Sequence, residues 1–437
     1  MRTALTILVG LACIGAARAD EQDYARIERG RALAVAADCM PCHTVPGGQP
    51  WAGGRKLATP FGTLLSANIT PDAATGIGDW TDDQFVATLR HGIRADGAHI
   101  YPAMPYPYFT HMTDDDARAI RAYLATVKPV RNDVTSDQLP FPLSVRADMI
   151  AWNALYFTPG TFQPDDRKSA EWNHGAYLVQ ALGHCGACHT SKNFAGADET
   201  DHALQGGELS GWYAPNLTGD NRTGLGRWSV DDIVEYLATG HNAVAAAAGP
   251  MAEVIEYSTS QMPKSDLQAI ATYLKDLPGQ ANGPAPLADL AEGKAIYVDG
   301  CAACHGSNGE GVSRLFPSLA HGPSVVQDDP ASLVRVVLEG VGTAGAPTAP
   351  AMPAFGWTAV ISDGLLSDAQ LESVICAGEA HSGHLAGSWK VDETFDIVRL
   401  RPMTRRMRFA SAEAGFSVTA PGPAKAARLP ASCSTTG

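Results

Sequence analysis

Beyond its N-terminal segment, the chain of 437 residues lacks long apolar runs, basic runs and nucleotide-binding motifs. No later segment holds the roughly 20 consecutive apolar residues that span a bilayer, so membrane association must come from a surface or a partner. The formal net charge is −14 and no long basic run precedes residue 399, which argues against nucleic acid as a partner. Without a P-loop, or a G-x-G-x-x-G after a strand, the chain offers no nucleotide or flavin site of its own.

Strand signals are also scarce. No clear run alternates apolar and polar residues, whereas segments with helical spacing recur between loops. The length suggests two to four domains. We therefore expect a mainly α, loop-rich fold that is divided into several domains.

The N-terminal segment, residues 1–19, predicts a secretory signal peptide. A single Arg2 precedes an apolar run over residues 4–14, and the small-residue pattern over residues 17–19 places cleavage before Asp20. We expect the mature protein to be exported.

The sequence has nine cysteines, and six of them form three copies of the pattern C-x-x-C-H, the attachment signature of c-type haem. Two thiols one helical turn apart can each add to a haem vinyl group, and the following histidine reaches the iron from the same side. The copies are Cys39-Met-Pro-Cys42-His43, Cys185-Gly-Ala-Cys188-His189 and Cys301-Ala-Ala-Cys304-His305. We predict three covalently bound haem c groups; the alternatives are zinc, which usually needs two separated ligand pairs, and a redox disulfide.

The flanks of the motifs repeat as well, which predicts three tandem cytochrome c domains of class I. A glycine that suits close helix packing precedes each motif, and a helix that ends at a glycine follows it. Thr81 and Ser229 are expected as N-caps of the first two of these later helices, with acidic residues in the first turn. The preceding glycines are Gly30, Gly175 and Gly293, and the closing glycines are Gly92, Gly240 and Gly340.

Methionine commonly fills the second axial position of iron in electron-carrying cytochromes c. Counted from the closing glycine of each copy, Met104 lies 12 residues on, Met251 lies 11 and Met352 lies 12. Met262 is a rival for the second copy because it too precedes a proline. Met112 occupies the same relative place in the first copy, however, which predicts apolar packing at a helix start. We expect Met104, Met251 and Met352 to be ligands, so that the haems transfer electrons and leave no open position for peroxide or oxygen.

These patterns divide the chain into expected segments. They are a signal peptide (1–19), a first unit (20–130), a connector with an amphipathic helix (131–170), a second unit (171–279), a linker (280–286), a third unit (287–376) and a tail (377–437). In the connector, Trp152 and Phe157 are expected to pack between domains. The last helix of the third unit is expected to be truncated.

Between the haem motifs lie three longer segments that carry a family resemblance: "LPFPLSVRADMIAWNALYF", "FQPDDRKSAEWNHGAYLV" and "GWYAPNLTGDNRTGLGRWS". In this order, and over residues 1 to about 375, the chain resembles the triheme cytochrome c subunit of membrane-bound bacterial dehydrogenases. These are the quinohaemoprotein alcohol dehydrogenases and the flavin-dependent gluconate, sorbitol and fructose dehydrogenases.

The resemblance implies an electron-transfer subunit without a substrate site of its own. Electrons would leave PQQ or FAD in a partner subunit, pass from haem to haem and reach ubiquinone, with the chain held peripherally at the periplasmic face of the cytoplasmic membrane. Carried over, the ligand sets are Cys39, Cys42 and His43 with Met104, Cys185, Cys188 and His189 with Met251, and Cys301, Cys304 and His305 with Met352. Three other functions stay open: the cytochrome partner of a periplasmic molybdenum hydroxylase or aldehyde dehydrogenase, a free periplasmic carrier, and a haem peroxidase.

The chain departs from this family pattern at its end. Ala377 and Gly378 stand where the family has an aromatic residue and more helix, and the residues that follow turn comparatively basic. We expect residues 377–437 to be a replaced and largely disordered C-terminus, for instance from a shifted reading frame.

Overall fold

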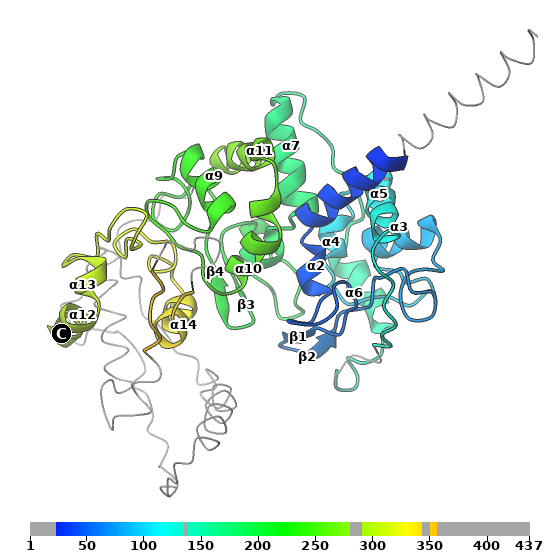
Figure 1. Ribbon diagram of the computed structural model, residues 1–437, viewed down its shortest axis with the longest axis horizontal. Helices are drawn as coiled ribbons and strands as arrows, with labels where there is room; N and C mark the ends of the chain where they lie inside the picture. The colour runs from blue at the N-terminus through cyan, green and yellow to red at the C-terminus, as the bar shows by residue number, and fades with distance from the viewer. Residues whose placement is uncertain (1–22, 135–138, 280–290, 343–349, 356–437) are drawn as a thin grey trace, which may run out of the picture.

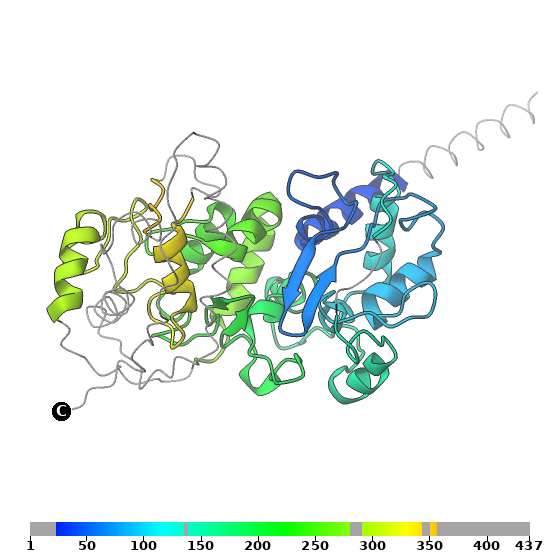
Figure 2. The ribbon, with the colours of Figure 1, turned by 90° about the horizontal axis from the view of Figure 1, so that it is seen from below.

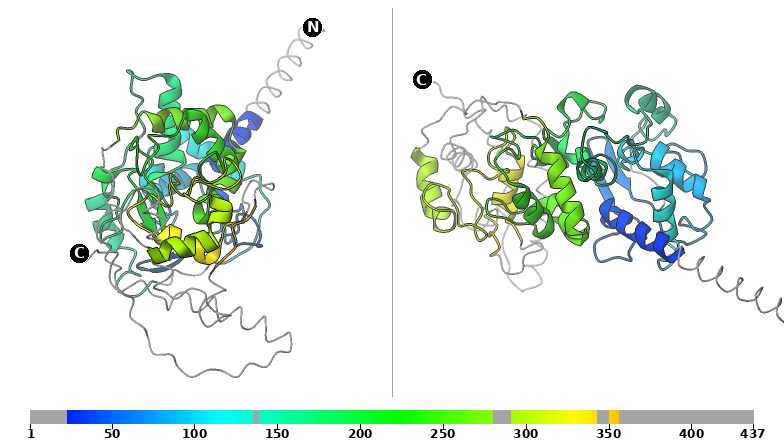
Figure 3. Two further views of the ribbon diagram at one scale, coloured as in Figure 1. Left: turned by 90° about the vertical axis from the view of Figure 1, so that its left-hand side faces the viewer. Right: turned by 90° about the horizontal axis from the view of Figure 1, so that it is seen from above.

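The computed structural model describes residues 23–134, 139–279, 291–342 and 350–355. The expected signal peptide (1–19), linker (280–286), last helix of the third unit and tail (377–437) lie outside the described residues. Within the described ranges, no helix combines the length and apolar character needed to cross a membrane. The second unit lies between the other two along the long axis (Figures 1 and 2, and the right panel of Figure 3).

The first unit consists of short helices and one hairpin. In order they are a helix over residues 23–36, α2 (Cys39–Cys42), β1 (Lys56–Thr59), β2 (Gly62–Leu65), α3 (Asp82–His91), α4 (Tyr106–Phe109) and α5 (Asp114–Leu124). Strands β1 and β2 pair antiparallel, with Lys56 opposite Leu65. The sequence did not predict this hairpin, because strands of four residues are too short to show alternation.

The connector contributes α6 (Asp148–Tyr156), and the second unit repeats the order of the first. Its elements are α7 (Ala170–Tyr177), η1 (Leu178–Leu182), α8 (Gly186–His189), η2 (Thr200–His202), β3 (Gly207–Leu209), β4 (Trp212–Ala214), α9 (Val230–Thr239), α10 (Gly249–Tyr257), η3 (Thr259–Gln261) and α11 (Lys264–Lys275). The third unit holds α12 (Ala291–Gly300), α13 (Ala302–His305) and α14 (Ala331–Glu339). Over the described ranges the architecture is helix-rich, with two small antiparallel hairpins, which confirms the mainly α prediction.

The helices that follow the first two haem motifs begin and end where the sequence predicts. The Thr81 hydroxyl accepts a hydrogen bond from the backbone of Gln84 at 3.2 Å, and the Ser229 hydroxyl accepts one from Asp232 at 3.1 Å. In both cases the third helical residue returns a bond to the N-cap backbone, which completes a capping box. The closing glycines of α3, α9 and α14 have φ of 64°, 74° and 74°, in the left-handed region that favours glycine.

Glycines allow the first and last helices of each of the first two units to cross in contact. A Cβ placed on Gly30 would lie 1.8 Å from the carbonyl oxygen of Ala119 in α5. A Cβ on Gly175 in α7 would lie 1.9 Å from the carbonyl oxygen of Ala269 in α11. Any larger residue would force these helices apart, so the predicted reason for the glycines is confirmed.

Aromatic side chains of the connector pack where the first two units meet. The indole N–H of Trp152 donates to the carbonyl oxygen of Ala195 in the second unit at 3.0 Å. Its ring also lies 6.5 Å from the ring of Tyr106 in the first unit, and the ring of Phe157 lies 5.1 Å from the same tyrosine. Trp152 therefore joins both units, as expected, whereas Phe157 packs on the first.

Helix α6 of the connector differs from the amphipathic helix that the sequence predicts. Met149 is buried, but Ile150 is 58 % exposed and Leu155 is 74 % exposed. Apolar side chains thus face solvent as well as the protein interior, and the helix is apolar on most of its surface.

Candidate haem-binding sites

The three C-x-x-C-H motifs form the same single helical turn. In each motif the backbone N–H of the histidine donates to the carbonyl oxygen of the first cysteine, at N···O distances of 3.1, 2.9 and 3.0 Å in the first, second and third units. All six cysteines of the motifs are free thiols. Two thiols and one imidazole therefore project from one helical turn, which is the arrangement that covalent haem attachment needs.

Each of the three histidines also has its ring held by a backbone carbonyl group. The Nδ1 atom lies 2.7 Å from the oxygen of Ala67 for His43, 2.6 Å from that of Pro215 for His189, and 2.9 Å from that of Pro317 for His305. A carbonyl oxygen only accepts hydrogen bonds, so Nδ1 carries the proton. Nε2 is then the nitrogen available to a metal, with the ring orientation fixed.

A glycine fixes the other end of each histidine. Its N–H donates to the backbone carbonyl of the histidine, and in all three cases the glycine has φ in the left-handed region. The pairs are Gly53 with His43 at 2.8 Å, Gly206 with His189 at 2.9 Å, and Gly311 with His305 at 2.8 Å. Sequence reasoning missed these glycines because the spacing from histidine to glycine differs in every unit.

The carbonyl groups that hold the first two histidines come from a recurring Asn turn. Asn68 follows Ala67, and its Oδ1 atom accepts a hydrogen bond from the backbone N–H of Thr70 at 3.0 Å. Asn216 follows Pro215 and accepts one from Thr218 at 2.8 Å. The repeated N-x-T signal was visible in the sequence, but only as part of a repeat and not as a device that orients a ligand.

Burial keeps the ligand groups neutral. It lowers the pKa of His43 and of His189, so both imidazoles stay unprotonated and able to ligate. Burial also raises the pKa of Cys39 and of Cys185 to about 12, opposite to the low thiol pKa of a redox-active C-x-x-C. The part of the chain that the structure describes contains no cluster of three His, Cys, Asp or Glu side chains suited to a metal ion. The raised thiol pKa values therefore fit haem attachment better than a redox disulfide.

The two methionines predicted for the first and second units lie in the same register of the fold. After α3 the N–H of Ile100 donates to the carbonyl oxygen of the closing glycine at 2.9 Å, and after α9 the N–H of Ala247 makes the equivalent bond at 2.7 Å. Met104 follows Ile100 by four residues, and Met251 follows Ala247 by four residues. This shared backbone geometry supports their assignment as equivalent ligands.

The rival methionines have a different environment. Met112 is completely buried in the hydrophobic core, and its counterpart Met262 packs against the same core. Met251 lies in the first turn of α10, four residues before the fully buried Ile255, so it shares the inward face of that helix. Met104 packs against the same core as Met262, so the register that Met251 shares with Met104, and not contact with the core, favours Met251 as the ligand.

In the third unit, Met352 is tied to the end of α14. Its backbone exchanges two hydrogen bonds with Val341, at 2.9 and 3.0 Å. A Cβ on Gly340 would lie 2.6 Å from the carbonyl oxygen of Met352, so only glycine allows this approach. The candidate ligand is thereby held beside the glycine that closes the helix, whereas in the first two units the residue bonded to the closing glycine lies four positions before the methionine.

Replacement of Met251 and Met262 by leucine, one at a time, separates the two candidates. Leucine nearly conserves volume, so either change should cost less than about 1.5 kcal/mol of stability. Met251→Leu removes the sulfur ligand, and we expect one haem to lose its methionine-to-iron charge-transfer band. Its midpoint potential should fall by at least about 120 mV, a hundredfold weaker preference for the reduced iron. Spectroscopy with potentiometric titration measures both, and loss of the band in Met262→Leu alone would reverse the assignment.

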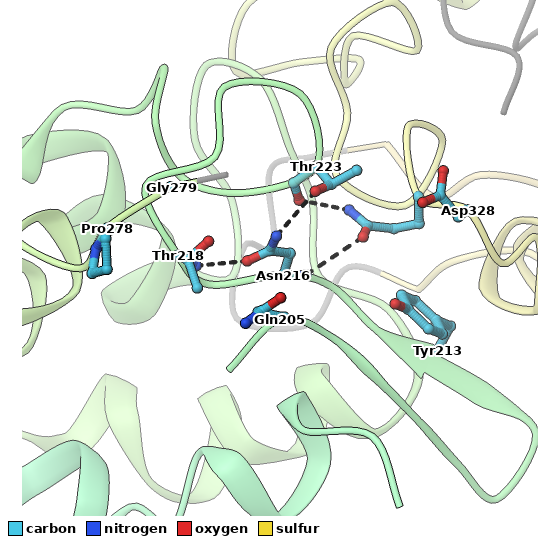
Figure 4. A pocket seen from close by; sticks show the side chains of 9 residues that line it. Gln205, Tyr213, Asn216, Thr218, Thr223, Pro278, Gly279 and Asp328 are labelled. Carbon is cyan, nitrogen blue, oxygen red and sulfur yellow. Dashed lines mark hydrogen bonds between the residues drawn. The ribbon is translucent and has the colours of Figure 1, made fainter. Parts of the chain in front are cut away.

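A polar pocket of about 400 Å³ lies beside the segment that orients His189 (Figure 4). Asn216 in its wall donates to Thr223 at 3.0 Å, and Gln327 of the third unit donates to the Thr223 carbonyl at 2.7 Å. The lining residues are Gln205, Tyr213, Asn216, Thr218, Thr223, Pro278, Gly279, Gln327 and Asp328. None of them is a predicted haem ligand. The pocket therefore lies next to the residues that support the His189 ring and outside the attachment motif.

Comparison with known proteins agrees with these features. The family model Cytochrome c matches residues 27–128 and 290–375. The gluconate 2-dehydrogenase cytochrome c subunit of Pantoea cypripedii is 39 % identical over 417 residues, covering 89 % of this chain and 91 % of that protein.

Two further relatives match most of the chain. The cytochrome c subunit of alcohol dehydrogenase (quinone) from Gluconobacter oxydans is 42 % identical over 380 residues, 80 % of this chain and 79 % of that protein. A nicotinate dehydrogenase subunit of Pseudomonas putida is 44 % identical over 344 residues, which is 76 % of this chain but 29 % of that protein. The chain therefore belongs to the family of electron-transferring cytochrome c subunits of bacterial dehydrogenases.

Proposed function

We propose that the chain binds three haem c groups and carries electrons from a PQQ- or FAD-containing dehydrogenase subunit to ubiquinone. It does so after export, as a peripheral protein at the periplasmic face of the cytoplasmic membrane. The observation that carries the proposal is the support of the motif histidine, which recurs three times with the same two backbone partners. The relatives named as cytochrome c subunits of dehydrogenases support the same role.

The residues of this chain have distinct tasks in the proposal. Bound haem supplies reversible one-electron transfer. The cysteine thiols would anchor it, the histidines would offer Nε2 to the iron, and the methionine sulfurs would serve as the second ligands that raise the potential. The proposed anchors are Cys39, Cys42, Cys185, Cys188, Cys301 and Cys304, and the proposed iron ligands are His43, Met104, His189, Met251, His305 and Met352.

Packing around the first site supports this division of tasks. Cys39 and Met104 are both partly buried and pack against the hydrophobic core that the first two units share, which limits the access of water to both side chains. If a histidine and a methionine held each haem, no open position would remain for a substrate. Substrate oxidation is therefore assigned to a partner subunit.

The match to a nicotinate dehydrogenase subunit favours one alternative. This chain aligns with only 29 % of that protein. The alternative partner is then a dehydrogenase outside the alcohol and sugar class, such as a periplasmic molybdenum hydroxylase or an aldehyde dehydrogenase. In that case the electron-transfer role is the same and only the donor changes.

Purification of the tagged, full-length chain from solubilised membranes tests the proposal. We expect a large subunit with PQQ or FAD to co-purify, its substrate to reduce all three haems, and a soluble ubiquinone analogue to reoxidise them. Molybdenum in the purified complex would assign the chain to the alternative partner. Recovery of the chain alone from the soluble periplasmic fraction would contradict the proposal and indicate a free carrier.

A further inference from the structure

The first two units meet through the segments that carry their haem motifs and candidate methionines. Helix α10 of the second unit, which contains Met251, contacts the attachment helix α2 of the first unit. Helix α4 of the first unit, which begins two residues after Met104, contacts η1 of the second unit, just ahead of Cys185. Each unit thus places its methionine-bearing segment against the attachment region of the other.

An ion pair stabilises the first of these contacts, between α10 and α2. Arg55 of the first unit makes a two-pronged bond to Glu253 in α10, with N···O distances of 2.5 and 2.8 Å. The same guanidinium donates to the carbonyl oxygen of Pro41, between the two cysteines of the first motif, at 2.8 Å. Both side chains are largely shielded, with 25 % and 33 % of their surface exposed, so the pair fixes orientation across the boundary.

A tyrosine fastens the second contact. A Cβ on Gly186, between the two cysteines of the second motif, would lie 2.6 Å from the hydroxyl oxygen of Tyr108 in α4. That hydroxyl donates to the carboxylate of Asp198 in the second unit at 2.5 Å. Lys192 forms an ion pair with the same carboxylate, and its ammonium lies 3.5 Å from the carbonyl oxygen of Gly186. The Tyr108 side chain therefore contacts α8, the second attachment helix, directly.

The contact with the third unit is built differently. Ser332 bonds to the backbone of Tyr213 at 2.9 Å, and Arg335 donates to the carbonyl oxygen of Gly211 at 2.6 Å. Ser332 and Arg335 both belong to α14, whereas the third attachment motif lies in Cys301 and α13.

We propose that the first and second units form one electron-exchange pair, in which Tyr108 and the Arg55–Glu253 ion pair are positioning residues that hold the two attachment helices face to face. This inference rests on the proposed attachment of haem to both motifs. The exchange is a one-electron step without bond making: one iron goes from ferrous to ferric as the other goes from ferric to ferrous. No proton or further reactant is needed.

The test measures electron exchange inside the isolated, full-length holoprotein. The protein is partly reduced with a small-molecule reductant, and NMR exchange between the resolved haem methyl resonances gives the rate for each haem pair. We compare the wild type with Tyr108→Phe, Glu253→Gln and the double variant. The matched control is Asp328→Asn, which removes the partner of Arg222 at the boundary of the second and third units.

We expect exchange between the first and second haems to be slowed about tenfold in the double variant, equivalent to about 1.4 kcal/mol in the barrier. Tyr108→Phe should slow exchange without moving any midpoint potential, because neither the tyrosine nor the phenylalanine side chain carries a charge. Glu253→Gln should also raise the potential of the first haem, since the lost carboxylate no longer favours the ferric form.

Low-spin His/Met spectra check that each variant keeps its haems, so that a folding defect is not read as slow exchange. Wild-type exchange in the double variant would overturn the inference, and so would equal slowing in Asp328→Asn. This readout involves neither dehydrogenase nor quinone, so it can fail while the proposed function holds. A wrong donor or acceptor would equally leave the exchange result in place.

Discussion

Replacing Cys185 and Cys188 together by alanine is expected to leave two haems per chain instead of three and to unfold the second unit. Without the thioether anchors no haem is retained there. His189, which is buried, would then lose the haem that we propose it binds. We expect a loss of about 5 kcal/mol or more, which is enough to unfold a domain at the lower end of the usual stability range. Intact-mass spectrometry gives the haem count, and circular dichroism with denaturant titration gives the unfolding.

Cysteine replacement by itself should have no such effect. The matched control replaces Cys376 and Cys433, which stand outside the three motifs. This control should keep three haems and unfold as the wild type does. If the Cys185/Cys188 variant still carried three haems per chain, covalent attachment at the second motif would be wrong.

Substitution of Gly175 by alanine is expected to destabilise the second unit by about 3 kcal/mol, the upper part of the usual range for overpacking. The direction of this change in stability is informative, because alanine normally stabilises a helix by about 1 kcal/mol relative to glycine. Here the new Cβ would lie 1.9 Å from the carbonyl oxygen of Ala269, a main-chain atom that moves only if α7 and α11 separate. The denaturant midpoint of the holoprotein measures the effect.

Gly160→Ala in the connector is the control for this substitution. A Cβ at Gly160 has no heavy atom within 4 Å, so stability should change by less than about 0.5 kcal/mol. Gly30→Ala should reproduce the large effect in the first unit, where the contact with Ala119 is 1.8 Å. A stabilised Gly175→Ala variant would show that the helices are not locked by this contact.

The sequence predicts those features that depend on neighbours along the chain. Thr81 and Ser229 cap their helices through bonds to residues three positions on, and Gly92 and Gly240 end them. The motif cysteines and histidines follow the same rule, because one helical turn places them together. Such features leave a signal in residue types and spacings.

Other features depend on tertiary packing and left no comparable signal. The carbonyl groups of Ala67, Pro215 and Pro317 hold the histidine rings, yet every residue has a carbonyl group. The bond between Arg55 and Glu253 joins residues 198 positions apart, and nothing in the local sequence of either predicts the other. The hairpin strands β1 to β4 are too short for alternation to be recognised.

The second unit shows that a short sequence motif can indicate a site that the general family model does not match. The general cytochrome c family model matches residues 27–128 and 290–375 and leaves the second unit unmatched. Even so, His189 has the same ring partner type, the same glycine bond and the same helical turn as its two counterparts. The second site was predicted from its own C-x-x-C-H motif, and the internal repeat predicted a domain around it.

The backbone support of the three histidines has a consequence for mutational scanning. A carbonyl acceptor belongs to the main chain, so no single side-chain replacement deletes it, and a scan of Ala67 or Pro317 would report both positions as tolerant. Sensitivity should instead emerge from changes in loop length, because one inserted or deleted residue between Cys42 and Ala67 withdraws the acceptor from its ring. Backbone support of the histidine rings thus predicts that these positions tolerate substitution while their loops do not tolerate insertion or deletion.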